Sequence, residues 1–212
     1  MLYFLIFTSD MSELTKYILN ITLGMLRNNI TRYKLSDYKI FIIHSGNEDH
    51  TLKTFRGCEI YYTLNKEKFK NKPDVDIQIH DMLKSIEYLK IEDNDFIVKI
   101  DYNCVPNSGS MYIGLLSELT KNDSLYDCII SYGVIGNTIL KKTGYCIKNV
   151  YAMRCKYLKQ LNDGYVKSSM SYMVHRDWAS VSYSIPDDKV IFLKNLDFNI
   201  YSLYGDGKYT YV

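Results

Sequence analysis

The sequence has little of several features that mark large protein classes. It has three prolines, and its five cysteines are scattered with no Cys-x-x-Cys pair, so a disulfide framework is not indicated and reduced thiols in the cytoplasm are expected. No apolar run reaches the roughly 20 residues of a membrane span, and the run at 2–7 is too short for a signal peptide. The net charge of +2 gives no field that favours nucleic acid or an anionic membrane. We therefore expect a soluble protein without a nucleic-acid partner.

Tyrosine, by contrast, is abundant, with 21 residues against two alanines. Enrichment in Tyr, Ile, Lys and Asn with little Ala is mostly what an AT-rich genome produces. The remaining significance is chemical, because a tyrosine offers a flat ring and a hydroxyl that suit sugars and bases in a cleft.

Apolar periodicity predicts strands that alternate with helices through the first half of the chain. The expected strands are 2–7, 39–44, 58–63, 96–100, 127–131, 145–153 and 190–193. The expected helices are 14–27, 76–89, 111–119 and 154–161, and Asp10 with Glu13 resembles a capping box for the first of them. No repeat or linker divides the chain. The pattern predicts one α/β domain over 1–212, with a mostly parallel mixed sheet of about six strands flanked by helices.

The most informative segment is 95–107, DFIVKIDYNCVPN. Its apolar run predicts a strand buried on both faces and interrupted only by Lys99, and Asp101 and Asn103 follow where the strand ends. In an open α/β sheet, ligands bind at the carboxyl ends of the strands. Two oxygen ligands there suit a hard divalent cation that carries a phosphate substrate. Because a turn also favours Asp and Asn, this interpretation depends on the residues around the pair.

Further candidates lie before and after this segment. Asp76, His80 and Lys84 are spaced by one helical turn each, so they share a helix face that is either the wall of a ligand site or an ordinary polar surface. Thr8 and Ser9 end the first strand, where residues of this kind commonly cap the helix that follows.

The later segment around the single tryptophan offers candidates for a second substrate. Asp177 is a candidate general base or binding carboxylate for an acceptor hydroxyl, and Trp178 would stack on a sugar face. His175 is a sugar-side candidate or, alternatively, a late metal ligand. The plain alternative for all three is an exposed loop of mixed charge.

The central residues resemble the donor-binding core of GT-A fold glycosyltransferases of the β-1,3-galactosyltransferase type. That family has an Asp, a Lys eight residues later, and then a strand of the form V-K-x-D-x-D. Asp76 and Lys84 have this separation, Lys99 and Asp101 fall in register, and Asn103 departs from the last Asp.

Two later segments are similar to the same family in the same order. Residues 144–161 are loosely similar to its G-x-G-Y-x-x-S strand and the helix that follows. Asp177 matches the Asp of its E-D-x-x-x-G segment, and Arg176 replaces the Glu, which puts a catalytic base at that position in question. The size and tyrosine content also resemble the small glycosyltransferases that chlorella viruses use on their capsid glycans.

The resemblance implies transfer of a hexose or deoxyhexose, glucose- or rhamnose-like, from a UDP-sugar to a hydroxyl of a glycan or glycoprotein, in the host cytoplasm if the protein is viral. Mn²⁺ or Mg²⁺ would be held by Asp101 and Asn103, and the amide of Asn103 makes cation binding depend on the phosphates of the nucleotide. Residues 1–105 would be the donor half and 106–212 the acceptor half, and retention of configuration is favoured if Asp177 only binds. The implied donor contacts are Thr8, Ser9, Asp76, His80, Lys84, Asp101 and Tyr102.

Two other functions remain open at this point. The departures at Asn103 and Arg176 are compatible with a non-catalytic domain of this type that binds a glycan or a protein partner. A sugar nucleotidyltransferase would share the α/β architecture, but it needs a glycine-rich basic loop after the first strand, where this chain has Thr-Ser-Asp-Met-Ser.

Overall fold

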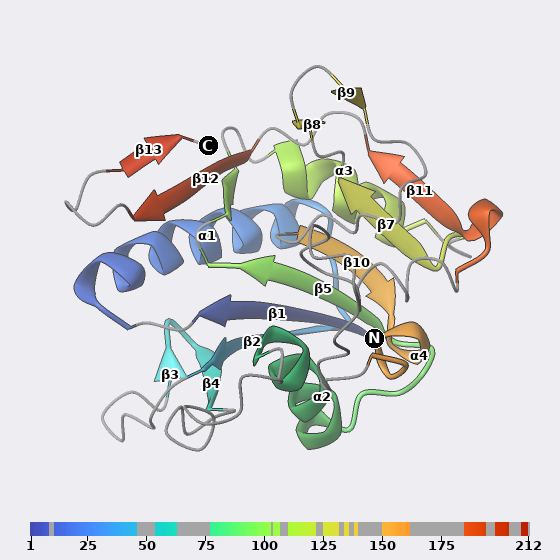
Figure 1. Ribbon diagram of the computed structural model, residues 1–212, viewed down its shortest axis with the longest axis horizontal. Helices are drawn as coiled ribbons and strands as arrows, with labels where there is room; N and C mark the ends of the chain where they lie inside the picture. Colours follow the sequence, from blue (N-terminus) through green and yellow to red (C-terminus); the bar gives the residue numbers. More distant parts are fainter. Residues whose placement is uncertain are drawn as a thin grey trace, which may run out of the picture.

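The structure is a computed structural model that describes residues 1–8, 11–45, 54–62, 77–102, 104–106, 110–121, 125–131, 134–135, 138–139, 150–161, 185–193, 198–203 and 209–211. Its centre is an eight-stranded sheet in the order β11-β7-β10-β5-β1-β2-β4-β3, with helices on both faces (Figure 1). The strands are β1 (Leu2–Thr8), β2 (Tyr38–His44), β3 (Thr54–Phe55), β4 (Cys58–Tyr62), β5 (Phe96–Asp101), β7 (Cys128–Ser131), β10 (Val150–Arg154) and β11 (Val190–Leu193). The helices are α1 (Glu13–Arg32), α2 (Ile77–Leu89), α3 (Ser110–Leu119) and the short α4 (Cys155–Leu158).

Most neighbouring strands in this sheet are parallel. The pairs β1–β2, β1–β5, β2–β4 and β7–β11 run in the same direction, whereas β10 is antiparallel to both β5 and β7 and β3 is antiparallel to β4. The predicted α/β class with a mostly parallel mixed sheet is therefore confirmed. The described residues place eight strands in this central sheet, where about six were expected. The carboxyl ends of β1, β2 and β5 meet at one edge, because Phe7 is in register with Asp101 and Thr8 with His44.

Two apolar cores lie on the two faces of the sheet. One contains Phe4, Ile6 and Val98 with the apolar sides of α1 and α3, and the other contains Leu5 and Ile97 with the apolar sides of α2 and α4. All six residues of β5 are buried, as expected for a central strand covered on both faces.

Helix α1 begins two residues later than the predicted capping box suggested. Its cap is Ser12, whose Oγ accepts a hydrogen bond from the Thr15 backbone N–H at 3.3 Å, and Asp10 lies outside the described residues. The helix continues to Arg32, five residues beyond the expected end at 27. Ser at the cap and Glu13 in the first turn both favour this start, because each interacts well with the unpaired N–H groups there.

The second half of the chain departs most from expectation. The strand expected over 145–153 is β10 at Val150–Arg154, and the helix expected over 154–161 is limited to Cys155–Leu158. A separate small sheet, not predicted, pairs β6 (Cys104–Pro106) with β12 (Phe198–Leu203) and β12 with β13 (Tyr209–Tyr211). A short hairpin joins β8 (Val134–Ile135) to β9 (Thr138–Ile139). Among the described helices, none is long and apolar enough to cross a membrane.

Candidate functional site

Buried polar residues gather where β1, β2 and β5 end. Thr8, His44, Ser45 and Asp101 are each less than 9% exposed, although they lie at or next to the ends of strands. Backbone hydrogen bonds fix these ends to one another, since Ser45 N–H donates to Thr8 O at 2.8 Å and Tyr102 N–H donates to Phe7 O at 3.0 Å. The carboxyl ends of parallel strands are where an open α/β sheet binds its ligands, so this edge is the candidate site.

A buried ion pair supports the carboxylate of this site from behind. Lys99 is 1% exposed, and its Nζ lies 2.5 Å from Asp101 Oδ1. The two side chains are two residues apart in β5, so they lie on the same face of the sheet, and the ammonium also lies 5.8 Å from the centre of the Phe7 ring. An isolated ammonium in the interior would be very costly, so the Asp101 carboxylate stabilises the buried charge of Lys99.

Helix α2 adds a second buried carboxylate. Asp81 is fully buried, and it accepts a hydrogen bond from Ser45 Oγ at the exit of β2. Ser85 Oγ donates to the main-chain oxygen of Asp81 at 2.6 Å. These contacts fix the first turns of α2 against the carboxyl edge of the sheet, so the helix is held beside the candidate site.

The structure brings together only some of the predicted site residues. Thr8, Asp101 and Tyr102 meet at the carboxyl edge of the sheet. His80 is half-buried on α2, and Lys84 is exposed on the same helix, where its Nζ pairs with Glu87 Oε2 at 2.7 Å. The predicted residues that lie outside the described residues are Ser9, Asp76, Asn103, His175, Asp177 and Trp178.

Sequence reasoning did not single out Lys99 or Asp81 as site residues. The signal for Lys99 was a charged residue in an otherwise apolar strand, two residues before Asp101. Side chains alternate between the two faces of a strand, so residues two apart lie on the same face. The signal for Asp81 was a carboxylate between Ile79 and Met82 in the apolar stripe of α2, where a charged residue needs a polar partner.

The residues at the edge fit a divalent cation that arrives with a phosphate group. Within the part of the chain that the structure describes, no cluster of three or more His, Cys, Asp or Glu side chains could hold a metal. The Asp101 carboxylate accepts a hydrogen bond from Lys99 Nζ on Oδ1. One carboxylate oxygen together with substrate phosphates is a usual way for a protein to bind Mg²⁺, so the donor set fits Mg²⁺ or Mn²⁺ bound as a nucleotide complex.

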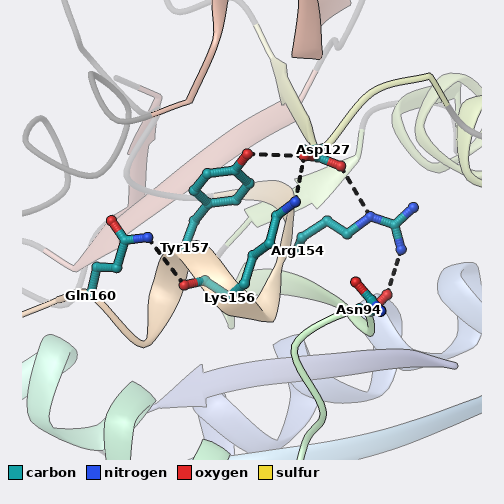
Figure 2. Close-up of polar contacts among 6 residues, drawn as sticks. All are labelled: Asn94, Asp127, Arg154, Lys156, Tyr157 and Gln160. Atoms are coloured by element: carbon teal, nitrogen blue, oxygen red, sulfur yellow. Dashed lines mark hydrogen bonds and ion pairs between the residues drawn. The ribbon is translucent and has the colours of Figure 1, made fainter.

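A second polar cluster lies at the opposite edge of the sheet, where β7 begins and β10 ends. Figure 2 shows Asp127 accepting hydrogen bonds from Arg154 Nε at 3.2 Å, Lys156 Nζ at 2.9 Å and Tyr157 OH at 2.9 Å. Arg154 also donates to the main-chain oxygen of Asn94. Burial acts to raise the pKa of Asp127, but the hydrogen bonds from Lys156, Tyr157 and Arg154 leave this pKa below its usual value. With both carboxylate oxygens engaged, this cluster joins β5, β7 and β10 and has a structural role.

Comparisons with known proteins agree on the fold. No protein-family profile matches the sequence, and no curated protein matches it. Among solved structures, glucosyl-3-phosphoglycerate synthase from Mycobacterium tuberculosis, in complex with Mn²⁺, UDP-glucose and phosphoglyceric acid, has a TM-score of 0.57 at 11% identity over 97% of this chain and 73% of that one. The catalytic domain of Drosophila β1,4-galactosyltransferase 7, in complex with xylobiose, has a TM-score of 0.51 at 9% identity over 93% of this chain and 68% of that one.

A third solved structure is also similar in fold to this chain. The bifunctional IspDF from Campylobacter jejuni has a TM-score of 0.50 at 15% identity and covers 92% of this chain, which spans only 49% of that protein. At such identities the likeness concerns the fold. The chain has the GT-A, Rossmann-like fold that the sequence predicted.

Proposed function

We propose that this chain is a metal-dependent glycosyltransferase that moves a sugar from a UDP-sugar to an acceptor hydroxyl. The observation that carries the proposal is the Asp101 carboxylate, held by Lys99 at the carboxyl end of β5 and next to the end of β1. In a GT-A fold this edge is where ligands of an open α/β sheet bind, and two structures of similar fold hold UDP-glucose with Mn²⁺ or a sugar ligand.

The donor would bind across the ends of β1 and β5. Thr8 and Ser9 would contact the nucleoside, and Tyr102 would line the donor beside Asp101. A bound Mn²⁺ or Mg²⁺ supplies Lewis-acid stabilisation of the charge that develops on the departing diphosphate. Asp101 would hold it through one oxygen together with Asn103.

Helix α2 would form one wall of the donor site. Asp76 and His80 would face the donor at the N-terminal end of α2. Lys84 lies one turn further along α2 and would contribute a positive charge to the site, in addition to its contact with Glu87. Positive charge near the diphosphate favours its binding and its departure.

The acceptor would be a glycan or glycoprotein hydroxyl, such as one on a viral capsid glycan, bound by the half of the chain that follows residue 105. Asp177 and Trp178 would face the reacting sugar and the acceptor, with His175 beside them. Since Arg176 stands where the resembling family has a Glu, we propose that Asp177 binds and that the anomeric configuration is retained. The transferred group would be a hexose or deoxyhexose, glucose- or rhamnose-like.

The test is nucleotide binding and sugar transfer with and without metal. Calorimetry should show UDP binding in Mn²⁺ that disappears in EDTA, and release of UDP from a panel of UDP-sugars should require the same metal. Asn103→Asp should strengthen binding of Mn²⁺, because a second carboxylate replaces an amide. Lys121→Met, a change at an exposed residue just after α3, serves as the control and should behave as wild type. Absence of both metal-dependent UDP binding and UDP release would leave a non-catalytic binding domain as the better description.

The role of Asp177 has its own test. Asp177→Asn should retain a measurable rate of sugar transfer if this residue only binds, and NMR of the product should show the same anomer as the donor. If the wild-type product is inverted and Asp177→Asn loses all turnover, Asp177 is instead the catalytic base.

A further inference from the structure

Lys99 is a charged residue buried under the candidate site. It is 1% exposed, it lies between Leu5 of β1 and Tyr151 of β10 in the sheet register, and its ammonium is 2.5 Å from Asp101 Oδ1. A strand covered on both faces ordinarily carries apolar residues at such a position. A methionine or leucine there would fill the space without the cost of burying a charge.

The positive charge of Lys99 weakens the electrostatic attraction between Asp101 and a cation. An ionised carboxylate attracts Mn²⁺ or Mg²⁺ through its negative charge, but the ammonium beside it compensates that charge and repels a second cation. Asp81, the other buried carboxylate on this face among the described residues, lies on α2 and accepts from Ser45. The described part of the chain also provides no cluster of three acidic, His or Cys ligands. Among the described residues, the negative charge that Asp101 offers a cation is therefore compensated by Lys99.

We propose that Lys99 is a positioning residue that sets the order of binding: it neutralises Asp101, so that the cation enters together with a nucleoside diphosphate and not before it. The inference rests on the proposed function and deepens it, because the diphosphate group supplies negative charge in place of the charge that Lys99 compensates on Asp101. Lys99 also fixes Asp101 Oδ1 on the inner side, which orients the carboxylate toward the strand end. A protein of this kind avoids holding a free metal ion in an empty site.

The experiment measures Mn²⁺ binding by the loss of the electron paramagnetic resonance signal of hydrated Mn²⁺, with and without UDP. Wild type should bind Mn²⁺ alone weakly and Mn²⁺ with UDP at least about tenfold more tightly. Lys99→Met removes the charge, and Lys99→Gln removes the charge but keeps an N–H donor for Asp101. Both variants should bind Mn²⁺ alone at least about tenfold more tightly than wild type does.

A matched control separates this effect from a general change in charge. Lys121→Met removes another lysine that pairs with a carboxylate at 2.5 Å, Glu118, but on the exposed surface of the chain after α3. Its Mn²⁺ affinity should equal that of wild type. The double variant Lys99→Met with Asp101→Asn should lose the tighter binding of the single variant, because the carboxylate responsible for it is gone.

The outcomes distinguish this inference from the proposed function. If wild type binds Mn²⁺ with UDP but both Lys99 variants bind Mn²⁺ alone as weakly as wild type, the role of Lys99 is overturned and the proposed function stands. If wild type binds Mn²⁺ equally well with and without UDP, the order of binding is overturned even when neither variant folds. If wild type binds no UDP in the presence of Mn²⁺, the proposed function is overturned together with this inference. Circular dichroism and urea unfolding establish that each variant is folded.

Discussion

Replacing Asp101 with Asn should destabilise the protein strongly, because it removes the carboxylate that pairs with the buried ammonium of Lys99. Asn has nearly the shape of Asp, so the change removes charge with little change in packing. Lys99 is 1% exposed, and the Asp101 side chain is 12% exposed. Removing one partner of a buried pair costs about 3–5 kcal/mol, and the slight exposure of Asp101 places the expected cost near the lower end, about 3 kcal/mol. Because a domain has about 5–15 kcal/mol in total, the variant should still fold.

The assay is urea unfolding at pH 7, monitored by circular dichroism. The unfolding midpoint should fall while the dependence on urea concentration stays the same, because the surface exposed on unfolding is unchanged. The matched control is Glu118→Gln, which breaks an ion pair of the same length, 2.5 Å, in which Lys121 is 60% exposed. An exposed pair contributes about 0–1 kcal/mol, so this control should lose much less stability.

The double variant Lys99→Met with Asp101→Asn tests the same explanation from the other side. It removes both charges and replaces the lysine with an apolar side chain of similar length, so it should recover most of the stability that Asp101→Asn loses. The reasoning is refuted if Asp101→Asn costs no more than Glu118→Gln. It is also refuted if the double variant is less stable than the single one.

Three further predictions concern other parts of the molecule. The pKa of Asp127 is lowered in the folded protein, so its ionised carboxylate stabilises the fold. This stabilisation is fully present above the unfolded pKa of 3.8 and is lost as the pH falls through the lowered pKa. Asp127→Asn should therefore cost about 1–3 kcal/mol at pH 7 in urea unfolding, and less at pH 2; an equal cost at both would contradict this. Burial raises the pKa of Cys155 to about 11, so mass spectrometry should find it alkylated by iodoacetamide at pH 8 only after unfolding, and rapid labelling of the native protein would argue otherwise. Gly57→Ala, at φ +71°, should cost about 1–2 kcal/mol, whereas Gly24→Ala in α1 should stabilise by about 0.5–1 kcal/mol. A urea midpoint that rises for Gly57→Ala or falls for Gly24→Ala would contradict the explanation for that glycine.

The apolar runs in the sequence were sufficient to predict the central strands of the sheet and the candidate residues at their carboxyl ends. The apolar runs that became β1, β2 and β5 are continuous because these strands are covered on both faces, and such runs have few alternatives. Parallel order then places their carboxyl ends at one edge. Thr8 and Asp101 therefore meet there, as their positions at the ends of predicted strands implied.

Contacts between distant segments were beyond prediction. Nothing local indicates that β12 pairs with β6, or that β10 runs antiparallel between β5 and β7, since pairing depends on how the whole chain folds. Asp81 was missed for the same reason. A carboxylate in the apolar stripe of a helix needs a polar partner, and only the tertiary structure shows that this partner is Ser45, which follows β2. Lys84 was predicted to contact the donor or to lie on an ordinary polar surface, and the structure places Glu87 of the same helix beside it.

The two carboxylates at opposite edges of the sheet show why one is structural and the other is the better candidate for a site. Asp127 has donors on both oxygens, from Arg154, Lys156 and Tyr157, so its lone pairs are committed to holding strands together. Asp101 is held on Oδ1 by a lysine that lies behind it on its own strand, and that contact fixes the carboxylate without joining it to another strand. An arrangement of this kind orients the carboxylate but cancels its charge. On the proposal made above, the ligand at this edge brings negative charge of its own along with the cation, as a nucleoside diphosphate does.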